Sequence, residues 1–524
     1  MKRLFQKISS YSGKDKENQH LIVLSYFCHK QYCILILQRF RTLFLKDPSK
    51  PLFWIVLGLL VKGLPFLFLL HSRPADSDIP GIWAGTFGDS HGYLDPIDNL
   101  LKNGSYSPEY RMPGYGFIYL LFRCFLPFDY SCNILIILQF ILAGISVYYL
   151  ALIAKTVFKS DKIFYVCFYL FLFSTYSNYF DGWIMTESFC NSALIFSVWF
   201  FVNYFQSAKV KNLLFSGMFL TWAVFLRPVF LPLFFVFILI VLVNTPLSTL
   251  NATGRWKKIS LNLLFLIIPF LITEGSWVIR NYNKHQKMVF LLGSPHPWAK
   301  TFYRFSLFNF INSWGGNYDL NDNAAPFHWF GYGKQLSKIP YHDSLPTYIY
   351  TSQFNKDSLL LVKNRIIALN DSVLTPDENY KYQNEVKEKL DRYTLSIKEE
   401  KPVLYYIEAP FFHSLPNLLF GPGSKMYLKR YNLPGKMRYI SEIFFTLFYY
   451  IVTVFGAIGA FIILFQYFRK NNIALTIAFL PLYTIIIHGI FFRYTENRYL
   501  MPAWAFLILC TSYFIVLLSK RKRA

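Results

Sequence analysis

The stretch NILIILQFILAGISVYYLAL, residues 133–152, contains no charged side chain. A run of about 20 apolar residues is long enough to cross the hydrocarbon core of a bilayer as a helix. Inside lipid the backbone has no water to bond with, so a single segment must form its hydrogen bonds within a helix. The stretch therefore predicts a transmembrane α-helix.

Similar apolar runs recur along the 524-residue chain. Windowed hydropathy predicts about ten transmembrane helices, at residues 51–70, 133–152, 163–176, 184–205, 213–226, 229–243, 259–279, 440–468, 473–492 and 500–518. The composition agrees, because 54% of the residues are hydrophobic and only 16% are charged, whereas soluble domains are about 25% charged. We expect an all-α polytopic membrane protein. Residues 21–45 are apolar but interrupted, which favours an amphipathic helix on the membrane surface over a further span.

The loops between these runs alternate in charge. Short basic clusters, which face the cytoplasm by the positive-inside rule, lie at residues 46–50, 155–162, 209–211, 255–258, 469–470 and 520–523. The basic residues of these loops contribute to the net charge of +24 where membrane topology requires them, so nucleic acid is not an expected partner. We expect a protein of the plasma or inner membrane, with both termini cytoplasmic and the longest polar segment on the extracytoplasmic side.

The same pattern divides the chain into four parts. We expect a cytoplasmic or interfacial N-terminal segment at 1–50 and a transmembrane catalytic module at 51–280, which includes a first outer loop at 72–112. An extracytoplasmic domain of mixed secondary structure follows at 281–439, and C-terminal transmembrane helices at 440–524. We expect the parts at 51–280 and 440–524 to lie in the lipid bilayer.

Acidic side chains mark the outer ends of the predicted spans. Asp89 lies in the first outer loop, within GDSHGYLDPIDNLLKNG at residues 88–104. A carboxylate above a membrane pocket suits a general base for a hydroxyl group; capping of a short helix is the alternative. Glu187 begins the span at 184–205 and would face the same cavity, or it interacts with the helix dipole. A divalent metal shared by Asp89 and His91 is conceivable, but the spacing is unspecific, and no cofactor is required.

Arginines form the second group at the outer ends, on the side where cytoplasmic retention does not explain them. Guanidinium groups bind phosphate with two parallel hydrogen bonds, so the group favours a lipid-phosphate site. For any one of them, snorkelling to headgroups or a structural ion pair is the alternative. The expected phosphate ligands are Arg111, Arg227, Arg280 and Arg498.

Six short motifs occur in order along the chain: GDS at 88–90, RMPGY at 111–115, TES at 186–188, LRP at 226–228, WVIRNY at 277–282 and ENRYLMP at 496–502. With these motifs the chain, from residue 51 to its end, resembles the GT-C-type glycosyltransferases that take a sugar from a polyprenyl-phosphate donor. Protein O-mannosyltransferases and lipid A aminoarabinose transferases are members of this family.

The resemblance implies a reaction and roles for single residues. It implies inverting transfer of a hexose or pentose to a hydroxyl of a glycan, lipid or protein, with Asp89 as base and Glu187 as a second catalytic acid. Tyr93, His91 and Tyr115 would contact the sugar or the acceptor. Many relatives carry an acidic pair in the first loop, whereas Ser90 follows Asp89 here, so Asp95 or Asp98 could assist. Three alternatives stay open: a polysaccharide polymerase or ligase, a lipid or glycan transporter, and a non-catalytic protein of the same fold.

Overall fold

The computed structural model places most of the chain. It describes residues 47–521 except 73–80, 87, 109–110, 245–251, 295–301, 317–324, 333–344, 372–373, 421–434 and 494–495. The amphipathic helix expected at 21–45 lies outside the described residues.

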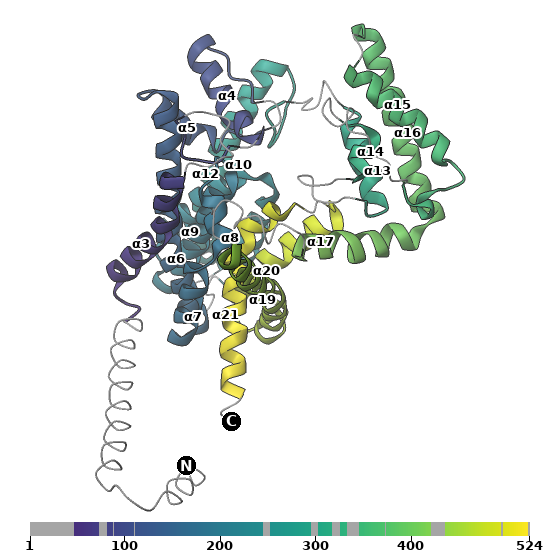
Figure 1. The fold of residues 1–524 in the computed structure, drawn as a ribbon. Coiled ribbons are helices and arrows are strands. Elements are labelled where there is room, and N and C mark those ends of the chain that lie inside the picture. Colours follow the sequence, from purple (N-terminus) through teal and green to yellow (C-terminus); the bar gives the residue numbers. More distant parts are fainter. Residues whose placement is uncertain are drawn as a thin grey trace, which may run out of the picture. The chain divides into compact units, whose positions relative to one another are not determined.

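Each of the ten apolar segments forms a helix or a pair of short helices (Figure 1). Seven are continuous: α3 (Pro51–Ser72), α6 (Phe128–Phe158), α9 (Thr186–Ser207), α10 (Val210–Leu226), α12 (Ala252–His285), α19 (Gly435–Tyr467) and α21 (Met501–Arg521). Three are interrupted: α7 (Asp161–Leu172) is followed by α8 (Thr175–Asp181), a 3-10 turn (Pro228–Phe230) precedes α11 (Pro232–Asn244), and α20 (Asn472–Ile486) continues as a π-helix (Ile487–Phe491). The all-α prediction is confirmed for the described residues.

The number of complete spans is smaller than the number of apolar segments. Six of the described helices are long and apolar enough to cross a membrane, or up to seven if α7 and α8, which meet at a bend of 52°, form one broken span. Three shorter apolar helices accompany them, at Pro51–Leu64, Val210–Leu226 and Pro228–Asn244. The chain is a multi-pass membrane protein, while the count of about ten spans stays a prediction.

Glycines allow some of these helices to pack closely. A Cβ at Gly217 of α10 would lie 2.1 Å from the carbonyl oxygen of Leu266 in α12, and one at Gly459 of α19 would lie 2.3 Å from that of Cys510 in α21. Small residues at such contacts are typical of membrane helices, which gain from close packing of their backbones. Further contacts join α21 to α7 and α9. They bring the last helix of the chain next to the helix that begins with Thr186 and Glu187.

A charged side chain, Lys62, lies inside the apolar helix α3. Lys62 of α3 is fully buried, and its Nζ donates hydrogen bonds to Ser177 Oγ (2.8 Å) and to Asn178 in α8. The carboxylate of Asp181 lies 3.6 Å from the same nitrogen and accepts a hydrogen bond from Ser188 (2.6 Å). The predicted span at 51–70 therefore contains a buried cation, which is paired within the described structure. A buried charge needs partners, and α8, which follows the bend, supplies them.

The segment at 281–439 has a hydrophobic core of its own. Its described elements are α13 (Arg304–Ser313), α14 (Ala325–Phe330), a 3-10 turn (Thr347–Ile349), α15 (Lys356–Asp371), α16 (Pro376–Glu400), a π-helix (Leu404–Ser414) and α17 (Leu415–Phe420). Leu307, Phe310 and Leu390 are among the fully buried residues of this core. The expected mixed secondary structure is corrected, because among its described residues only Thr351 and Phe354 form a β-bridge. The domain boundaries stay a prediction.

Candidate active site

The two predicted acids lie on neighbouring helix N-termini. Asp89 is in the first turn of α4 (Gly88–Asn103), and Glu187 is in the first turn of α9. The peptide backbones before these helices are bonded to each other, with Gly85 N donating to Gly182 O (3.0 Å) and Ile184 N to Gly85 O (3.1 Å). The Ser90 hydroxyl adds a hydrogen bond to Ile184 O (2.8 Å). These bonds fix the relative position of the two carboxylates.

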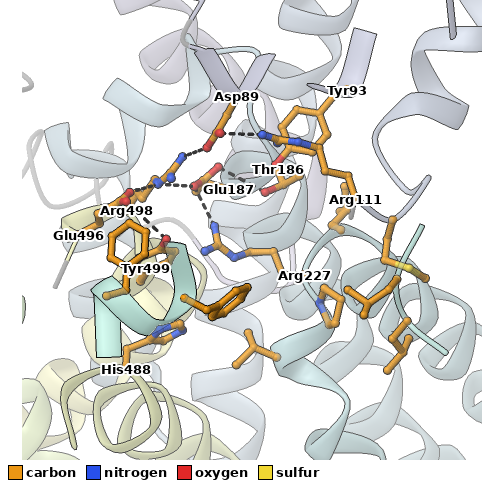
Figure 2. A pocket seen from close by; sticks show the side chains of 18 of the residues that line it. Asp89, Tyr93, Arg111, Thr186, Glu187, Arg227, His488, Glu496, Arg498 and Tyr499 are labelled. Carbon is orange, nitrogen blue, oxygen red and sulfur yellow. Dashed lines mark hydrogen bonds and ion pairs between the residues drawn. The ribbon is translucent and has the colours of Figure 1, made fainter. Parts of the chain in front are cut away.

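Both carboxylate oxygens of Asp89 accept hydrogen bonds from arginines (Figure 2). Arg111 Nη2 donates to Oδ1 at 2.6 Å, and Arg498 Nη1 donates to Oδ2 at 2.5 Å. The Asp89 side chain is 27% exposed. Its carboxylate thus forms the meeting point of two arginines that are 387 positions apart in the sequence, from residue 111 to residue 498.

These contacts set the ionisation of Asp89. Partial burial by itself raises the pKa of the carboxyl, but the charges of Arg498 and Arg111 and their hydrogen bonds outweigh it and lower the pKa from 3.8 to about 2. An opposite charge within hydrogen-bond distance favours the ionised form of a carboxyl. Asp89 is therefore a carboxylate at neutral pH, and in this arrangement it is a weak base.

Glu187 holds a different arginine. Its Oε1 accepts a hydrogen bond from Arg227 Nη1 at 2.8 Å, and Arg498 Nε lies 4.0 Å from the same oxygen. The Thr186 hydroxyl donates to Oε2 at 3.4 Å. Glu187 is almost fully buried, so its contacts with Arg227 and Arg498 compensate a charge that would otherwise be costly to bury.

Arg498 is the centre of the network. It contacts Asp89, Glu187 and Glu496, the last through an ion pair between Arg498 Nε and Glu496 Oε2. The ring of Tyr499 packs on the guanidinium groups of Arg498 and Arg227, at 5.5 and 5.1 Å. Figure 2 shows Arg498 between the three carboxylates. Arg493, which precedes the ENRYLMP motif, donates hydrogen bonds to the carbonyls of Asn312 and Tyr405.

The network borders a pocket of ≈ 430 Å³. Its described lining contains three carboxylates, from Asp89, Glu187 and Glu496, and four guanidinium groups, from Arg111, Arg227, Arg304 and Arg498. The remaining wall is largely apolar and consists of Met112, Leu226, Pro228, Val229, Leu291, Leu292, Phe305 and Phe308, with Tyr93, Thr186, His488 and Tyr499. A volume of this size is typical of a site for a small organic molecule. Arg304 comes from the segment at 281–439 and does not belong to any of the six sequence motifs.

The other predicted site residues are distributed unevenly. Tyr93 lines the pocket, and the Arg111 guanidinium lies 4.2 Å above its ring. Tyr115 is fully buried behind Tyr93, with 5.3 Å between the ring centres, and donates a hydrogen bond to Gln139 (3.0 Å). The structure therefore brings Tyr93 to the pocket surface, and Tyr115 supports it from behind.

Two predicted residues lie elsewhere. His91 Nδ1 is 3.4 Å from Asp95 Oδ1, and both side chains are about half exposed. The oxygens of Asp89 contact arginines and His91 contacts Asp95, and a metal shared by Asp89 and His91 stays a prediction. Among the described residues no group of three or more His, Cys, Asp or Glu side chains is arranged to hold a metal ion. Arg280 lines a separate cavity, so the structure does not bring it together with Arg111, Arg227 and Arg498.

The fold and the site define a multi-pass α-helical membrane protein with a charged pocket at the ends of its helices. No family model matches the chain, and no curated protein matches it. Three solved structures of oligosaccharyltransferase from Archaeoglobus fulgidus are similar to it, each over 88% of this chain at 11% identity. For the apo form the TM-score is 0.47, and the match covers 51% of that chain. For the complex with an inhibitory peptide and a dolichol-phosphate the TM-score is 0.41, and for the form tethered to an acceptor peptide it is 0.45; each of these two matches covers 50% of that chain.

The chain thus spans about half the length of the structures it matches. At this identity the likeness concerns the fold alone.

Proposed function

We propose that the protein is a membrane-embedded glycosyltransferase that moves a sugar from a lipid-phosphate donor to an acceptor hydroxyl on the extracytoplasmic face. The observation that supports this most is the placement of Asp89 between Arg111 and Arg498 on the pocket wall. In this proposal the three side chains provide a base and two phosphate ligands within one site, near the ends of apolar helices.

The charge of the pocket suits a phosphate diester. Four guanidinium groups face three carboxylates among the described lining residues, which leaves one positive charge for the single negative charge of a sugar–phosphate–polyprenyl diester. Arginines bind phosphate with paired N–H donors. The apolar part of the wall, with Leu226, Val229 and Leu292, suits the first carbons of the polyprenyl chain. Tyr93 is placed to contact the sugar ring.

The reaction is a single displacement with inversion. The acceptor oxygen forms a bond to the anomeric carbon while the bond from that carbon to the phosphate oxygen breaks, and the electron pair leaves with the polyprenyl phosphate. The hydroxyl proton passes to Asp89. A well-placed general base typically contributes a factor of about 10² to 10⁴, and positive groups stabilise the charge that develops on the leaving phosphate.

The two arginines couple these events. Before the donor binds they hold Asp89, whose pKa of about 2 makes it a weak base. The donor phosphate competes for the same guanidinium groups, and its charge grows as the bond breaks. As Arg111 and Arg498 turn toward the phosphate, the carboxylate loses the contacts that lower its pKa, so Asp89 becomes a stronger base when the proton must move. Glu187 and Glu496 act as positioning residues: Glu187 holds Arg227, and Glu496 holds the Nε of Arg498 while its Nη1 exchanges Asp89 for the phosphate.

The variant Asp89→Asn tests the proposal in purified protein supplied with labelled polyprenyl-phosphate sugar and cell-envelope acceptors. We expect turnover to fall by about 10² to 10⁴ because the base is lost. Donor affinity should be unchanged or higher, since a neutral amide competes less than a carboxylate for the arginines. Asp95→Asn is the matched control: it removes a carboxylate from the same helix, at a half-exposed position away from the pocket. Normal turnover by a folded Asp89→Asn protein would overturn the proposed role.

A further inference from the structure

A second cavity, of ≈ 610 Å³, lies at the end of α12, and among the described residues it shares no lining residue with the charged pocket. Residues 104–106, which follow α4, form one wall, and Ser276, Ile279, Arg280, Asn283 and Lys284 of α12 form the other. None of its described lining residues is acidic. This distinguishes it from the charged pocket, where carboxylates accompany the arginines.

Two cations share one acceptor in this cavity. Arg280 Nη2 and Lys284 Nζ both donate to the carbonyl oxygen of Tyr106, at 2.5 and 2.6 Å. Lys284 also donates to the hydroxyl of Ser107 (2.5 Å), and Arg280 Nη1 donates to Gly293 O (3.1 Å) and to the amide oxygen of Asn281 (2.7 Å). All of these acceptors are neutral.

Within the described part of the chain these neutral acceptors satisfy hydrogen bonds of Arg280 and Lys284 but do not compensate their two charges. Arg280 and Lys284 lie four positions apart on one helix, where like charges repel. The Arg280 guanidinium also lies on the rings of Trp277 and Tyr106, at 4.8 and 5.5 Å, which keeps it partly out of water. An anion bound between the two side chains would remove the repulsion, and phosphate fits both donors.

The face of α12 that leads to the cavity is apolar and exposed. Ile272 and Ile279 are 63% and 64% exposed, and together with Ser276 and Asn283 they follow the spacing of one helical face. Of the six long apolar helices described, α12 is the least buried, with 22% of its apolar window covered. An exposed apolar face on a membrane helix contacts lipid chains, so the cavity opens where such chains end.

We propose that this cavity, the α12 headgroup site, binds the anionic phosphate headgroup of a membrane lipid between Arg280 and Lys284, with the acyl chains along Ile272 and Ile279. The site is connected to the wall of the charged pocket. Trp277 Nε1 donates to Leu292 O (2.9 Å), and Asn281 donates to the carbonyls of Val289 and Leu292 (2.9 Å each). A lipid held here therefore steadies the residues that precede and include Leu292, which lines the charged pocket.

Photo-crosslinking tests the site with the full-length chain in nanodiscs of neutral phosphatidylcholine. A small share of phosphatidic acid carries a diazirine in its acyl chain near the headgroup, and peptide mass spectrometry locates the adducts. We expect adducts within residues 272–283. The same diazirine on phosphatidylcholine should give fewer, because its choline group is repelled. Equal adduct yields from the two probes would overturn the proposal.

Variants at the two cations sharpen the test. Each basic residue at an anionic lipid surface contributes about 1 kcal/mol, or about fivefold in affinity, so Lys284→Gln should lower the adduct yield about fivefold and Arg280→Gln/Lys284→Gln more. The matched control, Lys257→Gln/Lys258→Gln, removes two charges from the other end of the same helix and should leave these adducts unchanged. Arg280→Lys keeps the charge and should restore most of the yield.

Competition with inorganic phosphate distinguishes a lipid headgroup from soluble phosphate as the ligand of this site. If the site binds a lipid headgroup, millimolar phosphate leaves the adducts in place; competition that abolishes them would assign the site to soluble phosphate and overturn the lipid proposal. An unchanged adduct yield in the folded double variant would also overturn it. Glycosyl transfer is not needed for any of these measurements, so the outcome is independent of the proposed enzymatic activity.

Discussion

Asp89 is held by two arginines that the proposed donor also needs. Before the donor binds, the carboxylate of Asp89 neutralises part of the charge of the two guanidinium groups. In the proposed reaction the donor phosphate then replaces the carboxylate as their partner. This arrangement avoids an exposed cluster of positive charge at the end of the helices. It also means that the base and the phosphate ligands cannot be assigned separate energies, because a change in one alters the other.

The variant Arg111→Ala should weaken donor binding. A hydrogen bond to a charged group contributes about 1.5–3 kcal/mol, so the affinity for polyprenyl-phosphate sugar should fall by about 10- to 100-fold. Equilibrium binding of the labelled donor to purified protein measures this. Arg123→Ala is the control, because Arg123 forms its ion pair with Asp98 (2.8 Å) and is not among the residues that line the pocket. Equal donor affinity in wild type and Arg111→Ala would contradict the phosphate role.

The low pKa of Asp89 predicts how stability depends on pH. The folded-state pKa of about 2 is below the ordinary 3.8, so the folded protein binds this proton more weakly than the unfolded chain. The stabilisation is fully present above pH 3.8 and is lost as the pH falls through 2; it amounts to about 2 kcal/mol, of which about half is lost by about pH 3. Thermal unfolding of wild type and Asp89→Asn from about pH 6 to about pH 3 measures the difference. Parallel curves for the two proteins would contradict it.

At the scale of elements, glycines decide how closely the helices approach. Gly217 faces the α12 backbone at Leu266, whereas a Cβ at Gly275 of α12 would meet nothing within 4 Å. Gly217→Ala should therefore destabilise the protein by about 1–3 kcal/mol. Gly275→Ala should be neutral or stabilise it by up to about 1 kcal/mol, because alanine favours a helix. Thermal unfolding in detergent compares the two; equal midpoints would show that the close contact at Gly217 does not limit packing.

The bend between α7 and α8 is the second feature at this scale. The helix pair changes direction by 52°, and the segment after the bend supplies Ser177, Asn178 and Asp181 to the buried Lys62. Gln139 of α6 donates to the carbonyls of Asp181 and Trp183 (2.8 and 2.9 Å). These polar contacts hold the chain that leads from α8 into α9, and so they determine where Glu187 begins its helix.

At the scale of the whole molecule, the basic loops predict one orientation in the membrane. An epitope inserted between Ala208 and Lys209 should be accessible only after the cells are permeabilised, because basic loops stay cytoplasmic. An epitope between Leu374 and Thr375, in the segment at 281–439, should be accessible on intact cells. Antibody binding before and after permeabilisation measures both. The reverse result would place the charged pocket on the cytoplasmic side.

The sequence grouped some of the residues that line the charged pocket. Asp89, Glu187, Arg111, Arg227 and Arg498 were predicted to share the outer side, and they line one pocket. Arg280 was predicted with them but lines another cavity. The reason is that a position near a helix end specifies a depth in the membrane, while the direction of the side chain depends on the rotation and packing of the helix. Lys62 and Arg304 belong to none of the six motifs, because residues they contact come from remote segments of the chain.

The sequence by itself determined which described segments form apolar helices. Hydrophobic length and backbone hydrogen bonding act within one segment of about 20 residues, so 133–152 and its counterparts needed no knowledge of their neighbours. Only the tertiary structure decided the ion pairs of the pocket. Asp89 and Arg498 are separated by 409 positions, and their contact exists because α21 packs beside α9, whose first turn lies next to that of α4. Electrostatic pairing acts over a few ångströms in space, and no local pattern in the chain specifies which charges come that close.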